Sequence, residues 1–269
     1  MLVFFQFSYI IIKNVDEAFT FIATNYVRSK CLQAGSSCCE IPCDTITIKA
    51  GVHTLRRKAD LLVMKQLIYL DNAATTKTRP EVVEAMLPYF TEYYGNPSSV
   101  YEFSAEPKRA IAQARETIAK ALGAKSNEIY FTYGGTESDN WALISTAEAY
   151  QAKGKHIITT KIEHHAILHT CEYLEQRGFE VTYLDVDEFG VVKLDELEKA
   201  IRPDTILISV MFANNEIGTI EPIKEIGEIA KKHGILFHTD AVQAFCHVPI
   251  NVDECHIDML SSSAHKLNG

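Results

Sequence analysis

The sequence predicts an α/β fold in which helices cover both faces of a mostly parallel sheet. From about residue 64 onward, short apolar runs of strand length alternate with stretches of helix length. Alternation of this kind implies crossover connections, which join parallel strands. The chain has 269 residues, of which 47% are apolar, so it can bury a substantial core.

Each expected element follows from a local pattern. The apolar runs predict strands at 128–132, 156–160, 180–186, 205–212, 235–240 and 257–263. The stretches between them predict helices at 107–123, 137–154, 164–178 and 222–234. Glycines that can adopt the left-handed conformation are expected to end these helices: Gly123, Gly154, Gly178 and Gly234. Ligands bind at the carboxyl ends of parallel strands, so polar residues that end the apolar runs are candidate site residues.

Residues 1–63 differ from the rest and are predicted to be an extension of unknown role, beside a single domain formed by residues 64–269. The opening MLVFFQFSYIII lacks a basic n-region and is shorter than a bilayer span. A buried strand or an unstructured extension is therefore expected, and no membrane association. A short helix is expected over 15–30. The patch that follows contains Cys31, Cys38, Cys39 and Cys43, which are interpreted as incidental thiols, so no metal is predicted.

Charge and cysteine content narrow the class of protein. The formal net charge of −9 argues against a nucleic-acid partner, because such proteins carry a basic face that neutralises phosphates. The seven cysteines form no paired C-x-x-C hooks, and a disulfide scaffold is not expected in a chain of this length. A cytoplasmic protein that acts on small molecules is therefore predicted.

The first polar strand end is 129-IYFTYGGTESDNWAL-143. Glycines let the backbone approach a ligand, and a helix start offers N–H groups and a positive dipole end to a phosphate. The Thr136 hydroxyl adds a donor. Thr136 could equally be the N-cap of its helix, with Asp139 three residues later, so capping alone and capping with phosphate binding both remain open.

Two further strand ends carry an acid and an amine. Asp240 ends one apolar run, and a buried carboxylate needs a cation, a metal or a hydrogen-bond donor; the plainer alternative is an N-cap. Lys266 follows 257-IDML-260 and a serine-rich loop. Lysines are mostly exposed, yet a desolvated lysine with a lowered pKa forms Schiff bases with aldehydes. A phosphate site, an acid for a basic ring nitrogen and a lysine for an aldehyde together suggest pyridoxal 5'-phosphate.

Seven motifs, in order and in register, resemble those of the cysteine desulfurases in the class V aminotransferase family of fold-type I enzymes. These motifs are 67-LIYLDNAATT-76, 94-YGNPSS-99, 134-GGTESDN-140, 161-KIEHHAIL-168, 214-NNEIGT-219, 238-HTDAVQ-243 and 263-SAHKLNG-269. The resemblance covers residues 66–269 without an evident gap. It implies the large domain of a pyridoxal-phosphate-dependent transferase, with the small C-terminal domain missing.

The resemblance also implies roles for individual residues. Lys266 is similar to the Schiff-base lysine, Asp240 to the acid that keeps the ring nitrogen protonated, and His164 to the histidine that stacks on the ring and transfers protons. Gln243 would hydrogen-bond the phenolic oxygen, and Asn215 would contact cofactor and substrate. The matches to the phosphate-binding positions are Gly135, Thr136, Ser263 and His265. Without the resemblance, His164 would be interpreted as a helix-start histidine and Asn215 as a turn residue.

The activity implied by the resemblance is conversion of L-cysteine to L-alanine, with the sulfur passed as a persulfide. The implied partners are a sulfur acceptor or iron–sulfur scaffold protein in iron–sulfur assembly or thiolation, and a second subunit in a homodimer. The family's nucleophilic cysteine lies well past the lysine, and none of the seven cysteines matches its motif. The chain is therefore expected to be truncated and unable to complete sulfur transfer alone. Alternatives are another class V aminotransferase, lyase or epimerase activity, or a non-catalytic product.

Overall fold

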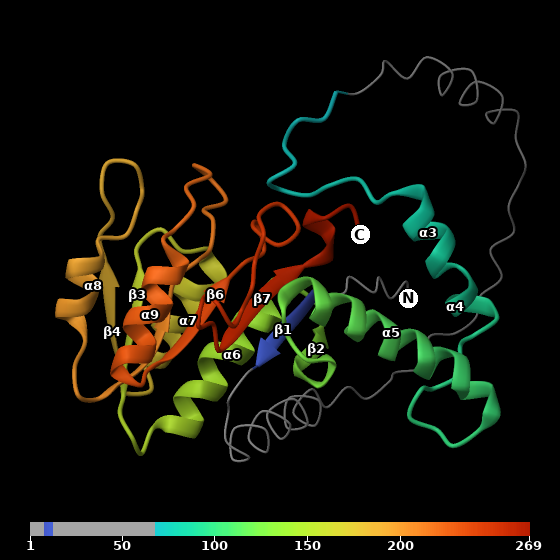
Figure 1. Cartoon of the computed structure of the whole chain (residues 1–269), viewed down its shortest axis with the longest axis horizontal. Helices are drawn as coiled ribbons and strands as arrows, with labels where there is room; N and C mark the ends of the chain where they lie inside the picture. The colour runs from blue at the N-terminus through green and yellow to red at the C-terminus, as the bar shows by residue number, and fades with distance from the viewer. Residues whose placement is uncertain (1–7, 13–67) are drawn as a thin grey trace, which may run out of the picture.

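The computed structural model describes residues 8–12 and 68–269, which share one seven-stranded sheet (Figure 1). The order of the strands across the sheet is β2-β1-β7-β6-β5-β3-β4. The helix predicted over 15–30 and the four N-terminal cysteines lie outside the described residues. Residues 8–12 of the apolar opening form a strand, which was one of the two alternatives expected for this segment.

All six strands predicted from the apolar runs are present. In chain order the sheet contains β1 (Ser8–Ile12), β2 (Ile129–Thr132), β3 (His156–Thr160), β4 (Glu180–Leu184), β5 (Thr205–Ser209), β6 (Leu236–Asp240) and β7 (Met259–Ser263). Every pair among β3 to β7 is parallel, whereas β1 runs antiparallel to both of its neighbours. The mostly parallel sheet is thus confirmed.

β5 ends at Ser209, three residues before the predicted limit at 212, although the chain stays alongside β6. Val210 and Phe212 still donate backbone hydrogen bonds to the carbonyls of His238 and Asp240, at 3.2 and 2.8 Å. Both residues are buried. The apolar run therefore continues beside β6 beyond the regular strand.

The four predicted helices are also present, with three more that were not predicted. The α-helices are α3 (Pro80–Met86), α4 (Pro88–Thr91), α5 (Ala105–Leu122), α6 (Gly135–Tyr150), α7 (His165–Glu175), α8 (Leu194–Ala200) and α9 (Ile223–His233). The helices that the sequence patterns missed, α3, α4 and α8, have at most seven residues each. None of the helices in residues 68–269 is long and apolar enough to cross a bilayer.

Two apolar cores lie on opposite faces of the sheet. Ile158, Ile208 and Leu260 belong to the core that includes residues of α5, α8 and α9. Their chain neighbours Ile157, Leu207 and Met259 belong to the other core, together with residues of α6 and α7. Successive strand residues point to opposite faces, so this alternation confirms helices on both sides. Complete burial of each such side chain contributes about 1.5–3 kcal/mol.

The four glycines predicted to end helices have three different outcomes in the structure. Gly123 and Gly234 are the C-caps of α5 and α9, with φ of 71° and 66°. Gly178 has φ of 84° but lies beyond the α7 C-cap, Gln176. The expectation for Gly154 is wrong, because α6 ends at Tyr150 and Gly154 is not left-handed. A Cβ at Gly154 would collide with the Asp204 carbonyl, so close backbone approach requires this glycine.

Candidate functional site

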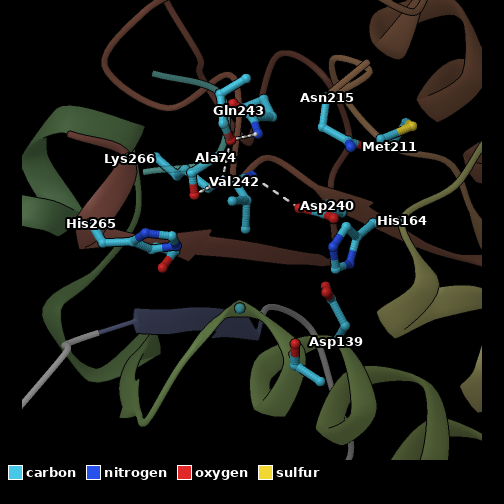
Figure 2. A pocket seen from close by; sticks show the side chains of 14 residues that line it. Ala74, Asp139, His164, Met211, Asn215, Asp240, Val242, Gln243, His265 and Lys266 are labelled. Atoms are coloured by element: carbon cyan, nitrogen blue, oxygen red, sulfur yellow. Dashed lines mark hydrogen bonds between the residues drawn. The ribbon is translucent and has the colours of Figure 1, made fainter. Parts of the chain in front are cut away.

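A cavity of about 350 Å³ opens at the carboxyl ends of β6 and β7, beside the start of α6. All nine site residues predicted from the sequence line this cavity: Gly135, Thr136, His164, Asn215, Asp240, Gln243, Ser263, His265 and Lys266. Five residues without a predicted role complete its wall: Ala73, Ala74, Asp139, Met211 and Val242. Figure 2 shows side chains from several elements converging on this space.

The loop after β7 is held in place by the segment that precedes α3. The Thr76 backbone N–H and hydroxyl both donate to the His265 carbonyl, at 2.9 and 2.7 Å. The Asn268 N–H in turn donates to the Thr76 hydroxyl at 2.7 Å. The His265 ring lies 3.1 Å from the Thr75 hydroxyl. These contacts, made by residues about 190 positions apart, fix the loop that carries His265 and Lys266.

The Lys266 amine reaches into the cavity, where it donates to the Ala74 carbonyl at 2.9 Å and also to the Ala73 carbonyl. Burial lowers the pKa of Lys266, although the carboxylates of Asp240 and Asp71 act in the opposite direction. The amine is therefore a better nucleophile at neutral pH than a solvated lysine. This partial burial supports the desolvated lysine considered from the sequence, while its bond to a cofactor stays a prediction.

The Gly-Gly-Thr segment forms the start of α6, but Thr136 does not cap it. The N-cap is Gly134, no side chain caps the helix, and Thr136 is the second helical residue. The capping interpretation of Thr136 is therefore wrong, and its side chain is left to line the cavity. A Cβ on Gly135 would lie 2.9 Å from the Val242 side chain and 3.9 Å from that of Ser263, so the helix start can sit this close to the ends of β6 and β7 only as glycine. This arrangement suits an anion.

Asp240 is buried at the end of β6, and its carboxylate accepts a hydrogen bond from the Val242 N–H at 2.9 Å. The N-cap alternative considered for this residue is wrong, because a turn and not a helix follows it, and the carboxylate closes that turn. This contact does not exclude a role in binding, because the side chain also lines the cavity. Burial raises the pKa of Asp240, while the Val242 N–H, His164 and Lys266 lower it. A buried carboxyl with a raised pKa gains most from a partner that carries a proton or a positive charge.

His164 has the helix-start role weighed from the sequence and also lines the cavity. It is the N-cap of α7, and its Nδ1 accepts a hydrogen bond from the Ala166 N–H at 3.1 Å. Since Nδ1 accepts, the proton of the neutral ring lies on Nε2. The ring lies beside Asp240 in the cavity (Figure 2). The capping bond thus fixes the tautomer of the His164 ring, with its proton on Nε2.

A neighbouring asparagine performs the turn function that Asn215 was considered for. The buried Asn214 side chain accepts from the N–H groups of Glu216 and Ile217, at 2.8 and 3.0 Å, and donates to the Ile162 carbonyl at 2.8 Å. Asn215 is therefore available to line the cavity. Gln243 reaches across it and donates to the Ala73 carbonyl at 3.1 Å.

Asp139 is a cavity residue whose role sequence reasoning missed. It lies one helical turn after Gly135 and is buried, and one of its carboxyl oxygens has no hydrogen-bond partner. The His238 ring lies 3.7 Å from that oxygen. Burial, and then the charge of Asp240, raise the pKa of Asp139, whereas burial lowers that of His238 to about 3. The helical spacing from Gly135 was the available signal, since residues four apart share a face.

Glu163 adds a third buried acid next to His164. One of its oxygens accepts from the Thr160 hydroxyl at 2.7 Å and from the Met211 N–H at 3.0 Å. Burial raises the pKa of Glu163 to about 8, against the effect of these two donors. At neutral pH the side chain is therefore mostly protonated in the folded protein.

Replacing Glu163 by glutamine is expected to stabilise the protein increasingly as the pH rises from about 4.5 to about 8. The folded state holds a proton that the unfolded chain releases in this range, so the wild type loses about 1.4 kcal/mol of stability per pH unit. Glutamine keeps the acceptor oxygen and has no such proton. Denaturant unfolding at several pH values measures the difference between the two proteins.

The exposed Glu198 provides a matched control, because its hydrogen bond with Lys232 lowers the pKa of its carboxyl. Glu198→Gln should therefore lack the stabilisation seen at high pH. A difference between Glu163→Gln and the wild type that does not change with pH would show that Glu163 is ionised throughout.

Comparisons with known proteins agree with this geometry. A family model described as aminotransferase class-V matches residues 68–269. The curated cysteine desulfurase IscS of Methanosarcina thermophila is 66% identical over 75% of this chain, and that of Clostridium botulinum is 62% identical over 77%. These alignments cover 50% and 52% of the two relatives, so the chain spans about half the length of the curated relatives it matches.

Solved structures show the same relationship. A structure described as SspA in complex with cysteine has a TM-score of 0.74 and 45% identity, and the match covers 76% of this chain and 58% of that one. A NifS-like protein has a TM-score of 0.73 and 45% identity, over 75% and 56% of the two chains. At 45% identity the two structures share a family with this chain as well as a fold.

The cavity fits the cofactor of this family, pyridoxal 5'-phosphate. The start of α6 offers N–H groups to an anion, the buried Asp240 carboxyl with its raised pKa would gain from a protonated ring nitrogen, and the half-buried Lys266 amine lines the same space. Fold, cavity, matched residues and relatives all lead to one conclusion: over residues 68–269 the chain belongs to the class-V aminotransferase family, whose desulfurase members depend on pyridoxal phosphate.

Proposed function

We propose that residues 68–269 form the cofactor-binding half of a cysteine desulfurase that acts on L-cysteine. The observation that carries this proposal is the meeting of a buried carboxyl, a half-buried amine and the start of a long helix in one cavity of about 350 Å³. The identity to proteins named cysteine desulfurase supports the choice of substrate. The activity is a proposal because the chain spans half the length of those relatives.

Different residues of the cavity would bind different parts of the cofactor. Gly135, Thr136, Ser263 and His265 would hold the phosphate, where the α6 dipole and the hydroxyl groups meet. Asp240 would hold a proton at the ring nitrogen. When bound, pyridoxal phosphate supplies an electron sink for the pair of electrons left at the substrate Cα.

Four further side chains that line the cavity would act on the cofactor and substrate. Lys266 would bind the cofactor aldehyde and, once released, accept a proton. The His164 ring lines the same space, and its protonated Nε2 would exchange protons with the substrate. Gln243 would orient the phenolic oxygen, and Asn215 would contact cofactor and substrate.

The thiol that accepts sulfur is not expected among the described cysteines. In residues 8–12 and 68–269 the free cysteines are Cys171, Cys246 and Cys255, of which Cys171 is buried. Burial raises the pKa of all three thiols. Thiolate is the attacking form, so none of the three is activated. This agrees with the expectation that this stretch of chain does not complete sulfur transfer.

We further propose that the protein works as a homodimer in the cytoplasm and passes sulfur to an acceptor or iron–sulfur scaffold protein. Support for the dimer comes from the large apolar residues exposed between positions 68 and 103: Ile68, Leu70, Val83, Leu87, Tyr89, Phe90, Tyr93, Tyr94, Val100, Tyr101 and Phe103. So many exposed apolar side chains in one stretch of chain call for a covering surface. The free cysteines support a reducing compartment.

The test is exchange of the substrate Cα proton in D2O. Purified chain with pyridoxal phosphate is expected to place deuterium at Cα of L-cysteine and L-alanine, as followed by NMR, without releasing sulfide. Release of sulfide together with alanine would contradict the incomplete sulfur transfer. Absence of exchange, or transfer of the amino group to a 2-oxo acid, would contradict the desulfurase assignment.

A further inference from the structure

Asp139 places a second buried acid in the cavity, beside Asp240. It lies on α6, is 1% exposed and lines the cavity, where Figure 2 shows it beneath Asp240 and His164. One of its carboxyl oxygens has no hydrogen-bond partner within the described residues. A charge on a buried carboxyl is costly unless it is paired and hydrogen-bonded. The protonation state of Asp139 therefore depends on which groups surround it.

The two acids meet on the same face of β6. The Asp139 carboxyl lies 3.7 Å from Nε2 of His238, and His238 precedes Asp240 by two residues on this strand. Residues two apart on a strand point to the same face of the sheet. Ser261, the register partner of Asp240 on β7, has its hydroxyl 3.0 Å from the same His238 nitrogen. Asp139 therefore stands over the end of β6, next to Asp240.

His238 does not supply a positive charge to Asp139. Its ring is completely buried, with Nδ1 at 2.9 Å from the Ser209 hydroxyl and Nε2 at 3.0 Å from the Ser261 hydroxyl. Burial lowers the pKa of His238 to about 3, so the ring is neutral at neutral pH. At this contact Asp139 thus faces a neutral ring and not a cation.

The surroundings of Asp240 offer more to a negative charge. Its carboxylate accepts a hydrogen bond from the Val242 N–H at 2.9 Å. Burial raises the pKa of Asp240, but this N–H, His164 and Lys266 all lower it. Three neighbouring groups thus favour a charge on the carboxyl at the end of β6, where a ring nitrogen would bind.

The surroundings of Asp139 favour a proton instead. Burial, and then the charge of Asp240, raise the pKa of Asp139; the Ser261 hydroxyl lowers it, and the charge of Glu163 raises it again. Glu163 is itself mostly protonated at neutral pH, so Asp240 is the main charge that Asp139 meets. Two neighbouring acids with such different surroundings separate their roles, because one retains the proton while the other carries the charge.

We propose that Asp139 is a positioning residue of the ring-nitrogen site: it holds the proton of the acid pair, leaves the negative charge on Asp240, and releases its proton when a cationic ring binds to Asp240. The release follows because the cation offsets the charge that helps to keep Asp139 protonated. Only the O–H bond of Asp139 breaks, and the buffer takes up the proton. The identity of the ring rests on the proposed function, whereas the place of the proton in the free protein does not.

Infrared spectroscopy of the protein without cofactor tests where the proton lies. Aspartate labelled with ¹³C at the side-chain carboxyl separates the aspartic acid bands from that of Glu163. Near pH 6, about two units above the ordinary pKa of aspartic acid, the wild type is expected to show a carboxylic-acid band. Asp139→Asn should lose this band, and Asp240→Asn should keep it. Loss of the band in Asp240→Asn, its persistence in Asp139→Asn, or its absence from the wild type would each overturn the proposal.

Proton release on binding provides the second readout. Calorimetry of pyridoxal phosphate binding in two buffers with different ionisation heats gives the number of protons released. Between about pH 6 and pH 8 the wild type is expected to release about 0.3 to 1 proton more than Asp139→Asn. Its affinity relative to that of the variant should therefore rise about two- to tenfold per pH unit. Ionisation of Glu163, His164 and Lys266 is common to both proteins and cancels in this difference.

Asp195→Asn is the matched control, because Asp195 is exposed on α8 and pairs with Lys199 at 2.8 Å. It should release as many protons as the wild type. If Asp139→Asn does not fold, Asp240→Asn takes its place in the calorimetry, since without the charge of Asp240 binding cannot trigger the release. Equal release by the wild type and the substituted protein at every pH would overturn the role of Asp139 in binding. If the wild type binds no pyridoxal phosphate, the proposed function fails, and the infrared result still decides which acid holds the proton.

Discussion

Lys266→Ala is expected to abolish covalent attachment of pyridoxal phosphate to the chain. The Lys266 amine is the cavity lysine, it is half-buried, and burial lowers its pKa. After borohydride reduction, intact mass spectrometry should show one added pyridoxal phosphate on the wild type and none on the variant. The exchange of Cα protons should fall by about 10²–10⁴, the range that positioned proton-transfer groups contribute.

Lys199 provides a matched control for the loss of a lysine. It is exposed on α8, where it pairs with Asp195 at 2.8 Å, and it does not line the cavity. Lys199→Ala should retain both the attached mass and the exchange rate. An adduct that persists in Lys266→Ala on another lysine would show that the assignment of Lys266 is wrong.

The regular part of the fold follows from local patterns in the sequence. The strands β3 and β7 are apolar runs that are buried throughout, and α9 ends at a glycine with positive φ, as its sequence predicts. The short helices α3, α4 and α8 escaped because one or two turns do not give a clear hydrophobic period. The role of Gly154 escaped because its reason is a contact with Asp204, far away in the sequence.

Cavity residues could be predicted from the sequence when the type of residue and its position at the end of a strand together suggested a chemical role. Asp240 and Lys266 are of this kind, and the family motifs added His164 and Asn215. Asp139 could not be recognised in the same way, because its significance depends on burial and on the nearby charge of Asp240. The place of β1 in the sheet depends on pairing across more than a hundred residues, which no local pattern contains.

Asp240→Asn is expected to weaken the chemistry of the site and yet to stabilise the folded protein without cofactor. Asparagine has the same shape and keeps an oxygen that can accept the Val242 N–H, but it has no charge to hold a proton at the ring nitrogen. An opposite charge at this range shifts a pKa by about 1–3 units, so exchange of the Cα proton should slow by about 10–10³. Attachment of the cofactor through Lys266 should remain.

The gain in stability has the opposite sign and depends on pH. Burial raises the pKa of Asp240 above its ordinary value, so over that pH range the folded state retains a proton that the unfolded chain releases. The wild type therefore loses stability as the pH rises through this range, and Asp240→Asn does not. Removing this charge also relieves Asp139, whose pKa Asp240 raises. Urea unfolding of both proteins at pH 5 and pH 8, without cofactor, measures the difference.

Asp195→Asn is the control, because Asp195 is exposed and its pKa is lowered by Lys199. It should not be stabilised at pH 8. If Asp240→Asn proved less stable than the wild type at pH 8, Asp240 would already have a favourable partner in the folded chain. Slower exchange combined with higher stability is the expected result for a residue kept for function, since a buried acid without a cation costs stability until the cofactor supplies one.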